Sequence, residues 1–186
     1  MDAHFRYWFL TSTTYGSWLP GDERGFVSHF PQEDGRFEIH NVVDTPYDRD
    51  VPPWQNACER RLTSPPVYLD QSQAAVVLAQ FQETAIHRQW TLYIASIMRN
   101  HFHVLIGASA TVHASHILRD LKAYSSRRLN QHWTKPASGT WWTESGSRRP
   151  LSTERACYDV YEYILNQSHC LAQWRRALDG ILITET

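Results

Sequence analysis

The pattern of apolar and polar positions predicts regular elements in most of the chain. Residues 7–13 are rich in β-branched and aromatic side chains, which is typical of a strand. Apolar residues recur at helical spacing over residues 70–89 and again over 112–132. Between these predicted helices, two apolar runs at 91–98 and 101–107 are joined by only two residues. Such a short connection predicts a hairpin of two strands.

The C-terminal third completes an α+β order of elements. Residues 141–142 fit a short strand or loop, and the polar, basic residues 144–150 fit a loop. A final helix is predicted to begin at Ser152 or Thr153 and to run to about Cys170. Strand, helix, hairpin, helix, short strand and helix together predict an antiparallel sheet with helices packed on it.

Residues 15–69 are the least regular part of the chain. Gly, Pro and Asp in YGSWLPGDERG (15–25) predict a structured turn, residues 35–39 a small hairpin, and residues 54–62 a short helix. A loop-rich stretch of this length is typical of an insertion with a role of its own. We therefore predict a single domain over residues 1–186 that carries an insertion at about 15–69.

Charge is unevenly distributed, although the formal net charge of the 186 residues is only −1. Up to Asp70, eleven acidic residues stand against six Lys or Arg, and after it twelve Lys or Arg stand against eight acidic residues. Residues 119–135 contain five Lys or Arg and a single acid, Asp120. Such a segment can contact phosphate without making the whole protein basic, and it also fits an ordinary solvated helix face.

Composition narrows the cellular setting. Three cysteines without a CxxC pair argue against a disulfide framework and against a thiolate zinc cluster. The N-terminal residues do not resemble a signal peptide, and no stretch approaches the roughly eighteen apolar residues that a membrane helix needs. We therefore expect a protein of a reducing cytoplasm with no membrane partner.

His101 and His103 lie two positions apart on a predicted strand. Both imidazoles therefore project from the same face of the sheet, while Phe102 projects from the opposite, buried face. Two adjacent imidazoles can supply part of the ligand set of a divalent cation. The motif alone fits equally well with two histidines on a partly exposed strand.

Tyr163 and Gln167 are four positions apart and are predicted to share one face of the final helix, beside its apolar stripe. A phenol attacks a phosphodiester poorly near its usual pKa of about 10. A divalent cation on the phosphate would lower this barrier, and the amide oxygen of Gln167 offers it a third ligand. Taken alone, the helix favours a boundary tyrosine with a polar neighbour.

Three motifs in this order are similar to those of a known family. NHFHVLI (100–106), ILRDLKAYSSRRLN (117–130) and YILNQ (163–167) together resemble the single-tyrosine HUH transposases. This family includes small insertion-sequence transposases and relatives associated with repetitive extragenic palindromes. The resemblance covers about residues 7–13 and 70–170, and the start of the insertion resembles an extension found in one subgroup. WWTESGSRRPLS (141–152) departs from the pattern, because relatives often carry a more apolar stretch there.

The resemblance implies a fold, a chemistry and a setting. The fold would be a ferredoxin-like or RRM-like antiparallel sheet, in a bacterial protein associated with the nucleoid. Tyr163 would cleave single-stranded DNA, often beside a hairpin, and form a 5′-phosphotyrosine link with a free 3′-hydroxyl. His101, His103 and Gln167 would bind Mg²⁺ or Mn²⁺. Family members commonly act as homodimers, in some of which the tyrosine helix serves the metal site of the partner.

Alternatives remain for several of these roles. Tyr124 is the alternative nucleophile, although packing or stacking is its more ordinary role. The alternative function is a catalytically silent nucleic-acid-binding module on the same fold, which the intact set of motifs disfavours. Five cations are candidates for contacts with the DNA backbone: Lys122, Arg127, Arg128, Arg148 and Arg149. For the three that lie on the predicted helix 112–132, the alternative role is to keep the protein soluble.

Overall fold

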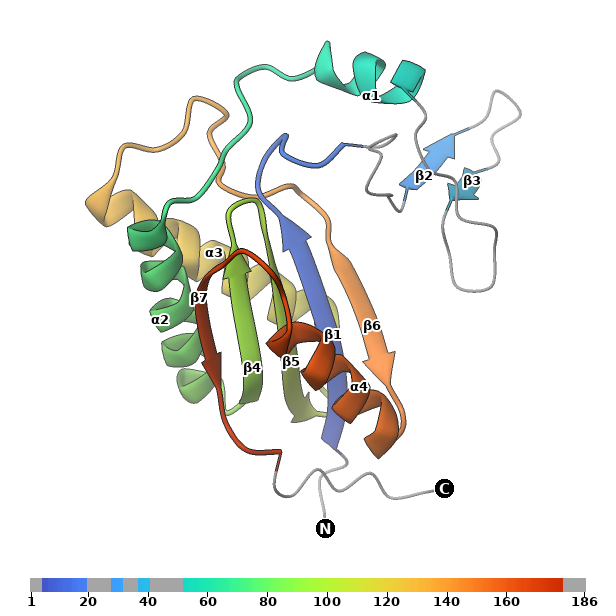
Figure 1. Cartoon of the computed structure of the whole chain (residues 1–186), viewed down its shortest axis with the longest axis vertical. Coiled ribbons are helices and arrows are strands. Elements are labelled where there is room, and N and C mark those ends of the chain that lie inside the picture. The colour runs from blue at the N-terminus through green and yellow to red at the C-terminus, as the bar shows by residue number, and fades with distance from the viewer. Residues whose placement is uncertain (1–4, 20–27, 32–36, 41–51, 179–186) are drawn as a thin grey trace.

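The computed structural model describes residues 5–19, 28–31, 37–40 and 52–178. Its centre is an open five-stranded sheet with the strand order β6-β1-β5-β4-β7, in which every neighbouring pair is antiparallel (Figure 1). The strands are β1 (Phe5–Thr13), β4 (Thr91–Met98), β5 (His101–Ser109), β6 (Ser147–Leu151) and β7 (Cys170–Arg175).

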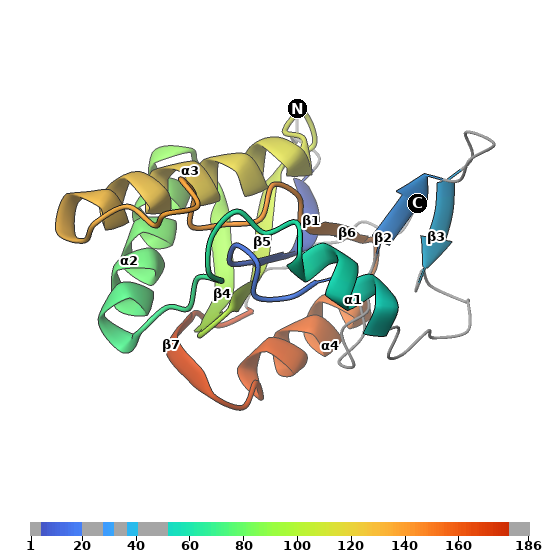
Figure 2. The ribbon, with the colours of Figure 1, turned by 90° about the horizontal axis from the view of Figure 1, so that it is seen from above.

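Helices cover both faces of this sheet. On one face lie α2 (Gln71–His87) and α3 (Ala114–His132), and on the other lies α4 (Glu154–Leu165) (Figure 2). Apart from the elements between β1 and α2, the chain begins with β1-α2-β4-β5-α3-β6, which has the order and pairing of a ferredoxin-like fold, and α4 and β7 are added to it. The predicted α+β class with an antiparallel sheet is confirmed.

Side-chain alternation along the strands gives each face a core of its own. On β5, Phe102, Val104 and Ile106 are fully buried against α2 and α3, whereas Leu105 joins the core beneath α4. Because both faces are covered, β4 and β5 are buried at almost every position. These strands therefore form nearly continuous apolar runs in the sequence, as strands covered on both sides do.

The predicted helices on the first face are also confirmed, within two residues at each end. Helix α2 begins with a capping box, in which the side chain of Asp70 accepts from the backbone N–H of Gln73 at 2.8 Å. In return, the side chain of Gln73 accepts from the backbone N–H of Asp70 at 3.0 Å. Phe81 and Ala85 then face the sheet at helical spacing.

The described part of the predicted insertion contains a two-stranded hairpin and a short helix. The strands are β2 (Ser28–Pro31) and β3 (Phe37–His40), and the helix is α1 (Pro52–Glu59). Residues 20–25 of the predicted turn, and residues 35 and 36 of the predicted hairpin, lie outside the described residues. Thr14 and Ser17, which follow β1, are buried, and the N–H of Thr14 donates to Asn100 O at 2.8 Å. This hydrogen bond holds the chain after β1 against the short turn between β4 and β5, directly before His101.

Two predictions for the C-terminal third are wrong. The segment 144–150 was predicted as a loop, yet residues from Ser147 onward form the edge strand β6, because pairing with β1 uses main-chain groups. The close approach needs Gly146, whose Cβ would lie 2.6 Å from Thr11 O. The final helix ends at Leu165 instead of Cys170, and the chain turns through His169 (φ 58°) into β7.

Residues 141 and 142 follow the prediction of a short strand or loop, since Trp142 forms an isolated bridge with Thr14. None of the helices in the described part of the chain is long and apolar enough to cross a membrane.

Candidate active site

Strand β5 places His101 and His103 side by side on the sheet face that α4 covers. Their ring centroids are 4.8 Å apart, with 75° between the ring planes. Phe102 points the other way and packs edge-on against Phe81 and Trp142, with centroids 4.9 Å and 5.2 Å away. His103 is buried, with 6% of its surface exposed, and His101 is half-buried. The strand thus gives the two imidazoles the shared face expected from their spacing.

Helix α4 brings Tyr163 to this pair within one subunit. The hydroxyl of Tyr163 lies 3.5 Å from Nε2 of His103, at the outer limit of a hydrogen bond. Phe9 on β1 packs against both rings, with centroids 5.3 Å from His103 and 5.9 Å from Tyr163. Tyr163 is nevertheless 51% exposed. The phenol is therefore both held beside an imidazole and accessible from solvent.

The neighbours of the two imidazoles favour a proton on Nδ1 of each ring. Nδ1 of His101 lies 2.8 Å from the amide oxygen of Asn100, which can only accept, so Nδ1 carries the proton. Nδ1 of His103 lies 2.8 Å from the hydroxyl of Thr11, which can take the same role. Burial, assisted by the nearby His101, lowers the pKa of His103 to about 3. His103 is therefore neutral at physiological pH.

Gln167 lies beyond the end of α4, so the predicted stacking with Tyr163 on one helix face is wrong in detail. The two residues still touch, because Nε2 of Gln167 donates to the backbone oxygen of Tyr163 at 2.9 Å. No three His, Cys, Asp or Glu side chains gather closely enough to hold a metal ion within the described ranges. Among the described residues, the protein would therefore offer a cation at this place the two imidazoles and uncharged oxygen ligands.

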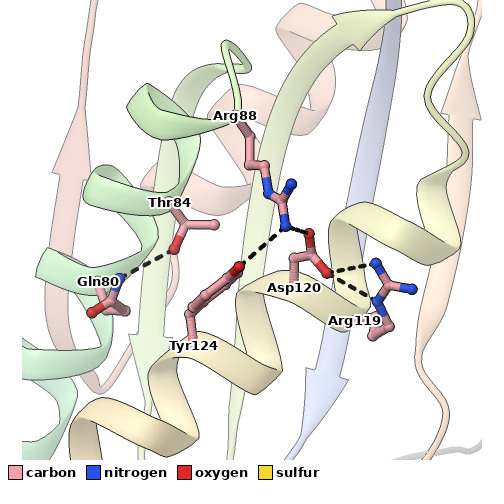
Figure 3. A network of polar contacts seen from close by, with 6 residues as sticks. All are labelled: Gln80, Thr84, Arg88, Arg119, Asp120 and Tyr124. Atoms are coloured by element: carbon pink, nitrogen blue, oxygen red, sulfur yellow. Dashed lines mark hydrogen bonds and ion pairs between the residues drawn. The ribbon is translucent and has the colours of Figure 1, made fainter.

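Tyr124 lies on α3, on the sheet face opposite the histidines. Its hydroxyl accepts from Nη2 of Arg88 at 3.1 Å, and Arg88 also pairs with Asp120 at 2.8 Å (Figure 3). Arg119 binds the other oxygen of the same carboxylate, and the guanidinium of Arg127 lies 5.3 Å from the centre of the Tyr124 ring. The sheet separates Tyr124 from His101 and His103, which argues against it as the nucleophile at this site.

Three of the five candidate cations lie on α3, on the sheet face opposite α4. Burial lowers the pKa of Lys122 to about 8, and its ammonium donates to the backbone oxygens of residues 143, 144 and 145. Lys122 thus supports the loop that leads into β6. Arg127 and Arg128 are exposed, and Arg128 contacts Gln131 at 3.4 Å.

Arg148 and Arg149 point to opposite faces of the sheet, because they are neighbours on strand β6. Arg149 pairs with Phe9, which belongs to the α4 face, and Arg148 pairs with Leu10, which belongs to the α2 and α3 face. Both are exposed. Of the five candidate cations, Arg149 is the one that shares a sheet face with His103.

Several residues at this site were not foreseen from the sequence. Trp18, from the predicted insertion, meets the ring of His101 edge-on with centroids 5.4 Å apart. The strand register also places a row of polar residues across all five strands on the face of His103. In strand order, this row consists of Ser147, Thr11, His103, Ser96 and Gln173. The alternation of side chains along FLTST (9–13) predicts that Thr11 shares a sheet face with Phe9. The sequence near Thr11 does not indicate which residues of distant strands lie beside it.

Comparisons with known proteins give one family match. The family model described as "Transposase IS200 like" matches residues 66–167, which is more than half of the chain and includes both histidines and Tyr163. No curated protein matches the chain by sequence.

The similar solved structures include the following two. One is a candidate transposase from Deinococcus radiodurans R1, with 15% identity, 90% of this chain and 95% of that chain covered, and a TM-score of 0.45. The other is a REP-associated tyrosine transposase bound to a REP hairpin, with 9% identity and a TM-score of 0.44. That match covers 86% of this chain and 62% of the other, so this chain spans less than two thirds of its length.

Proposed function

Because this chain belongs to the IS200-like transposase family, we propose that it cleaves and rejoins single-stranded DNA through a 5′-phosphotyrosine intermediate on Tyr163. One observation carries the proposal. Tyr163 is 51% exposed, and its hydroxyl lies 3.5 Å from Nε2 of a buried, neutral His103 in the same subunit. A nucleophile beside a group that can bind a phosphate-bound cation is the arrangement that this reaction requires.

The proposed step transfers one phosphodiester bond. Oη of Tyr163 attacks the phosphorus, the bond from phosphorus to the 3′ oxygen breaks, and that oxygen leaves as a hydroxyl with a proton from water. The phenol proton passes to solvent, which the 51% exposure of Tyr163 allows. In rejoining, a 3′-hydroxyl attacks the phosphotyrosine and releases the phenol. The covalent link conserves the bond energy, so no nucleotide hydrolysis is needed.

We assign His101 and His103, through Nε2, and Gln167, through its amide oxygen, as ligands of Mg²⁺ or Mn²⁺. The residues fit this role because each imidazole has a polar neighbour at Nδ1, as metal-binding histidines usually do. The low pKa of His103 also keeps its ring in the form that binds metals. When bound, the cation would polarise the scissile phosphate and stabilise the charge that develops on it.

Other side chains orient these groups and contact DNA. Phe9 packs against the rings of both Tyr163 and His103 and limits their rotation. Arg149, on the same sheet face, is placed to contact a phosphate of the strand bound at the site. The remaining candidate cations serve DNA farther away, because Arg127 and Arg128 lie on α3 and Arg148 points to that side. Lys122 contributes indirectly by supporting the loop before β6.

A covalent-adduct assay tests the proposal. The protein is incubated with hairpin-bearing single-stranded DNA and Mn²⁺ or Mg²⁺, and a protein–DNA adduct is sought on a denaturing gel. We expect an adduct with the wild type and with Tyr124→Phe, and none with Tyr163→Phe. Tyr158→Phe is the matched control, because Tyr158 is an exposed tyrosine on the same helix.

Two outcomes would contradict the proposal. An adduct that persists in Tyr163→Phe assigns the nucleophile to another residue. A wild type that binds the DNA but forms no adduct with any hairpin or metal supports the silent binding module instead.

A further inference from the structure

The tyrosine helix is connected at both ends to the edges of its own sheet. Only two residues separate the end of β6 at Leu151 from the start of α4 at Glu154, and four separate its end at Leu165 from β7 at Cys170. Strands β6 and β7 are the two opposite edges of the sheet, so α4 crosses the sheet from one edge to the other. Both views of the fold show this crossing (Figures 1 and 2).

Two polar side chains from neighbouring strands hold the last turn of α4. The hydroxyl of Ser96 on β4 donates to the backbone oxygen of Ile164 at 3.0 Å. Nε2 of Gln173 on β7 donates to the hydroxyl of Ser96 at 2.8 Å, to Ile164 O at 3.3 Å and to Leu165 O at 3.2 Å. These carbonyls belong to the end of a helix, where backbone oxygens lack partners within the helix.

The burial of Ser96 indicates that these contacts are not incidental. Its side chain is fully buried beneath α4, where neighbouring positions of the sheet carry apolar residues such as Ile94 and Leu105. A buried hydroxyl costs free energy unless it is hydrogen-bonded, and here its bonds join α4 to β7. A further bond strengthens the same connection, because the hydroxyl of Tyr161 donates to the backbone oxygen of Arg176 at 3.0 Å.

The contacts act directly beside the reacting groups. Ile164, whose carbonyl is held, immediately follows Tyr163. Ser96 lies opposite His103 in the register of β4 and β5. The hydrogen bonds therefore join the main chain next to the phenol to the strand position next to the imidazole.

From this arrangement we propose that Gln173, acting through Ser96 and the carbonyls of Ile164 and Leu165, is a positioning residue that holds Tyr163 beside His103 of its own subunit. The inference rests on the proposed function, because positioning matters only if Tyr163 reacts. In this proposal, the role of β7 is to bring Gln173 to the C-terminal end of α4.

The chemistry of the contact suggests a graded set of variants at Gln173, an exposed position where substitution leaves no cavity. Gln173→Ala removes the donor. Gln173→Glu keeps the size but places carboxylate oxygens against carbonyl oxygens at the negative end of the helix. Gln173→Lys restores a donor and adds a charge that this helix end favours. A role in strand packing alone would not distinguish Glu from Lys in this way.

The readout is the rate of adduct formation at saturating DNA and metal, measured beside the dissociation constant for DNA. We expect Gln173→Ala to lower the rate by roughly 10- to 100-fold, as small displacements of reacting groups do. Gln173→Glu should lower it further, and Gln173→Lys should stay near the wild type. DNA affinity should change little in Gln173→Ala. The same three substitutions at Gln71, which is exposed on α2, control for added charge.

Each outcome decides the matter. The inference is supported if adduct forms fastest with Gln173→Lys, more slowly with Gln173→Ala and slowest with Gln173→Glu, while Gln173→Ala binds DNA with unchanged affinity. It is overturned if Gln173→Glu reacts like the wild type, if Gln173→Lys is as slow as Gln173→Ala, or if the loss is one of affinity alone. A wild type without any adduct overturns the proposed function and this inference with it, which is distinct from failure of the inference alone.

Discussion

His103 combines deep burial with a polar contact at each ring nitrogen. Thr11 lies 2.8 Å from Nδ1 and the hydroxyl of Tyr163 lies 3.5 Å from Nε2, while the ring is 6% exposed. Burial disfavours the charged imidazolium and is the main reason for the low pKa. The folded protein therefore keeps this ring in the metal-binding form well below the pH at which a free histidine is protonated.

The pKa of His103 has a consequence for stability that urea denaturation can measure. The folded protein holds the pKa near 3, while the unfolded chain has the usual value of about 6.5. Between these values the unfolded chain binds more protons, so lowering the pH favours unfolding. From pH 7.5 to 5 this group should cost on the order of 2 kcal/mol, and at still higher pH it should have almost no effect.

In the variant His103→Gln, the free energy of unfolding should fall less at low pH, because the contribution of His103 is removed. Free energies of unfolding of both proteins, measured with a chelator at pH 5 and pH 7.5, give the comparison. The difference between the two pH values should be smaller in the variant. Equal pH dependence in the two proteins would mean that His103 is not held neutral by the fold.

Residue spacing indicated part of the site and could not indicate the rest. The two-residue period of a strand was enough to place His101 and His103 on one face. The partners of these rings come from distant parts of the chain, as Thr11 and Trp18 do. Their contacts depend on strand register and on the path of the chain after β1, which local patterns do not contain.

Among the elements, β6 changes the interpretation of the basic segment that precedes the tyrosine helix. In a loop, Arg148 and Arg149 would be equivalent cations. On a strand, they face opposite sides of the sheet, and Arg149 alone shares the face of the candidate site. The strand thus places on opposite faces two candidate cations that the sequence could not distinguish.

These two arginines provide a matched pair for a binding experiment. We expect Arg149→Ala to weaken binding of a short single strand and to reduce the slope of log affinity against log salt by about 1, as loss of one phosphate contact does. Arg148→Ala removes the same charge from the same strand and should affect this short ligand less. Dissociation constants over a range of salt concentrations test the difference. Equal effects of both changes would contradict the assignment of faces.

The success of prediction differed between elements for a physical reason. Strands β4 and β5 and helices α2 and α3 have strong local patterns, because each buries a continuous stripe or run. Edge strands need only main-chain pairing, so the polar β6 resembled a loop. Residues 166–170 were predicted to continue the final helix, because no glycine or proline lies between Leu165 and Cys170 to mark the turn through His169.

At the scale of the whole molecule, the ferredoxin-like sheet serves as a platform with different roles on its two faces. The α2 and α3 face carries a closed core and the cations of α3, while the other carries the imidazoles, the phenol and Arg149. The predicted insertion reaches this second face through Trp18. The insertion therefore contacts the candidate site at His101.

The connection of α4 to both edge strands predicts how mixed subunits behave. For Tyr163 to serve the histidines of a partner, the helix would have to leave its sheet, which would break the contacts of Gln173 and unpair β7 from β4. The homodimer that the family resemblance implies stays a prediction, and Tyr163 lies beside His103 of its own subunit. A mixture of Tyr163→Phe and His103→Ala should therefore form no more adduct than either variant alone.

This mixing experiment is sharpest when the two variants are co-expressed with different tags and purified through both, so that any dimer contains one copy of each. In a site built across subunits, one of the two sites in such a dimer would combine an intact Tyr163 with an intact His103, and about half of the activity would return. In a site built within one subunit, both sites stay broken whatever the oligomeric state. Recovery of adduct would show that α4 exchanges between subunits, and adding Gln173→Ala should then increase it, because that change removes contacts that hold the helix on its own sheet.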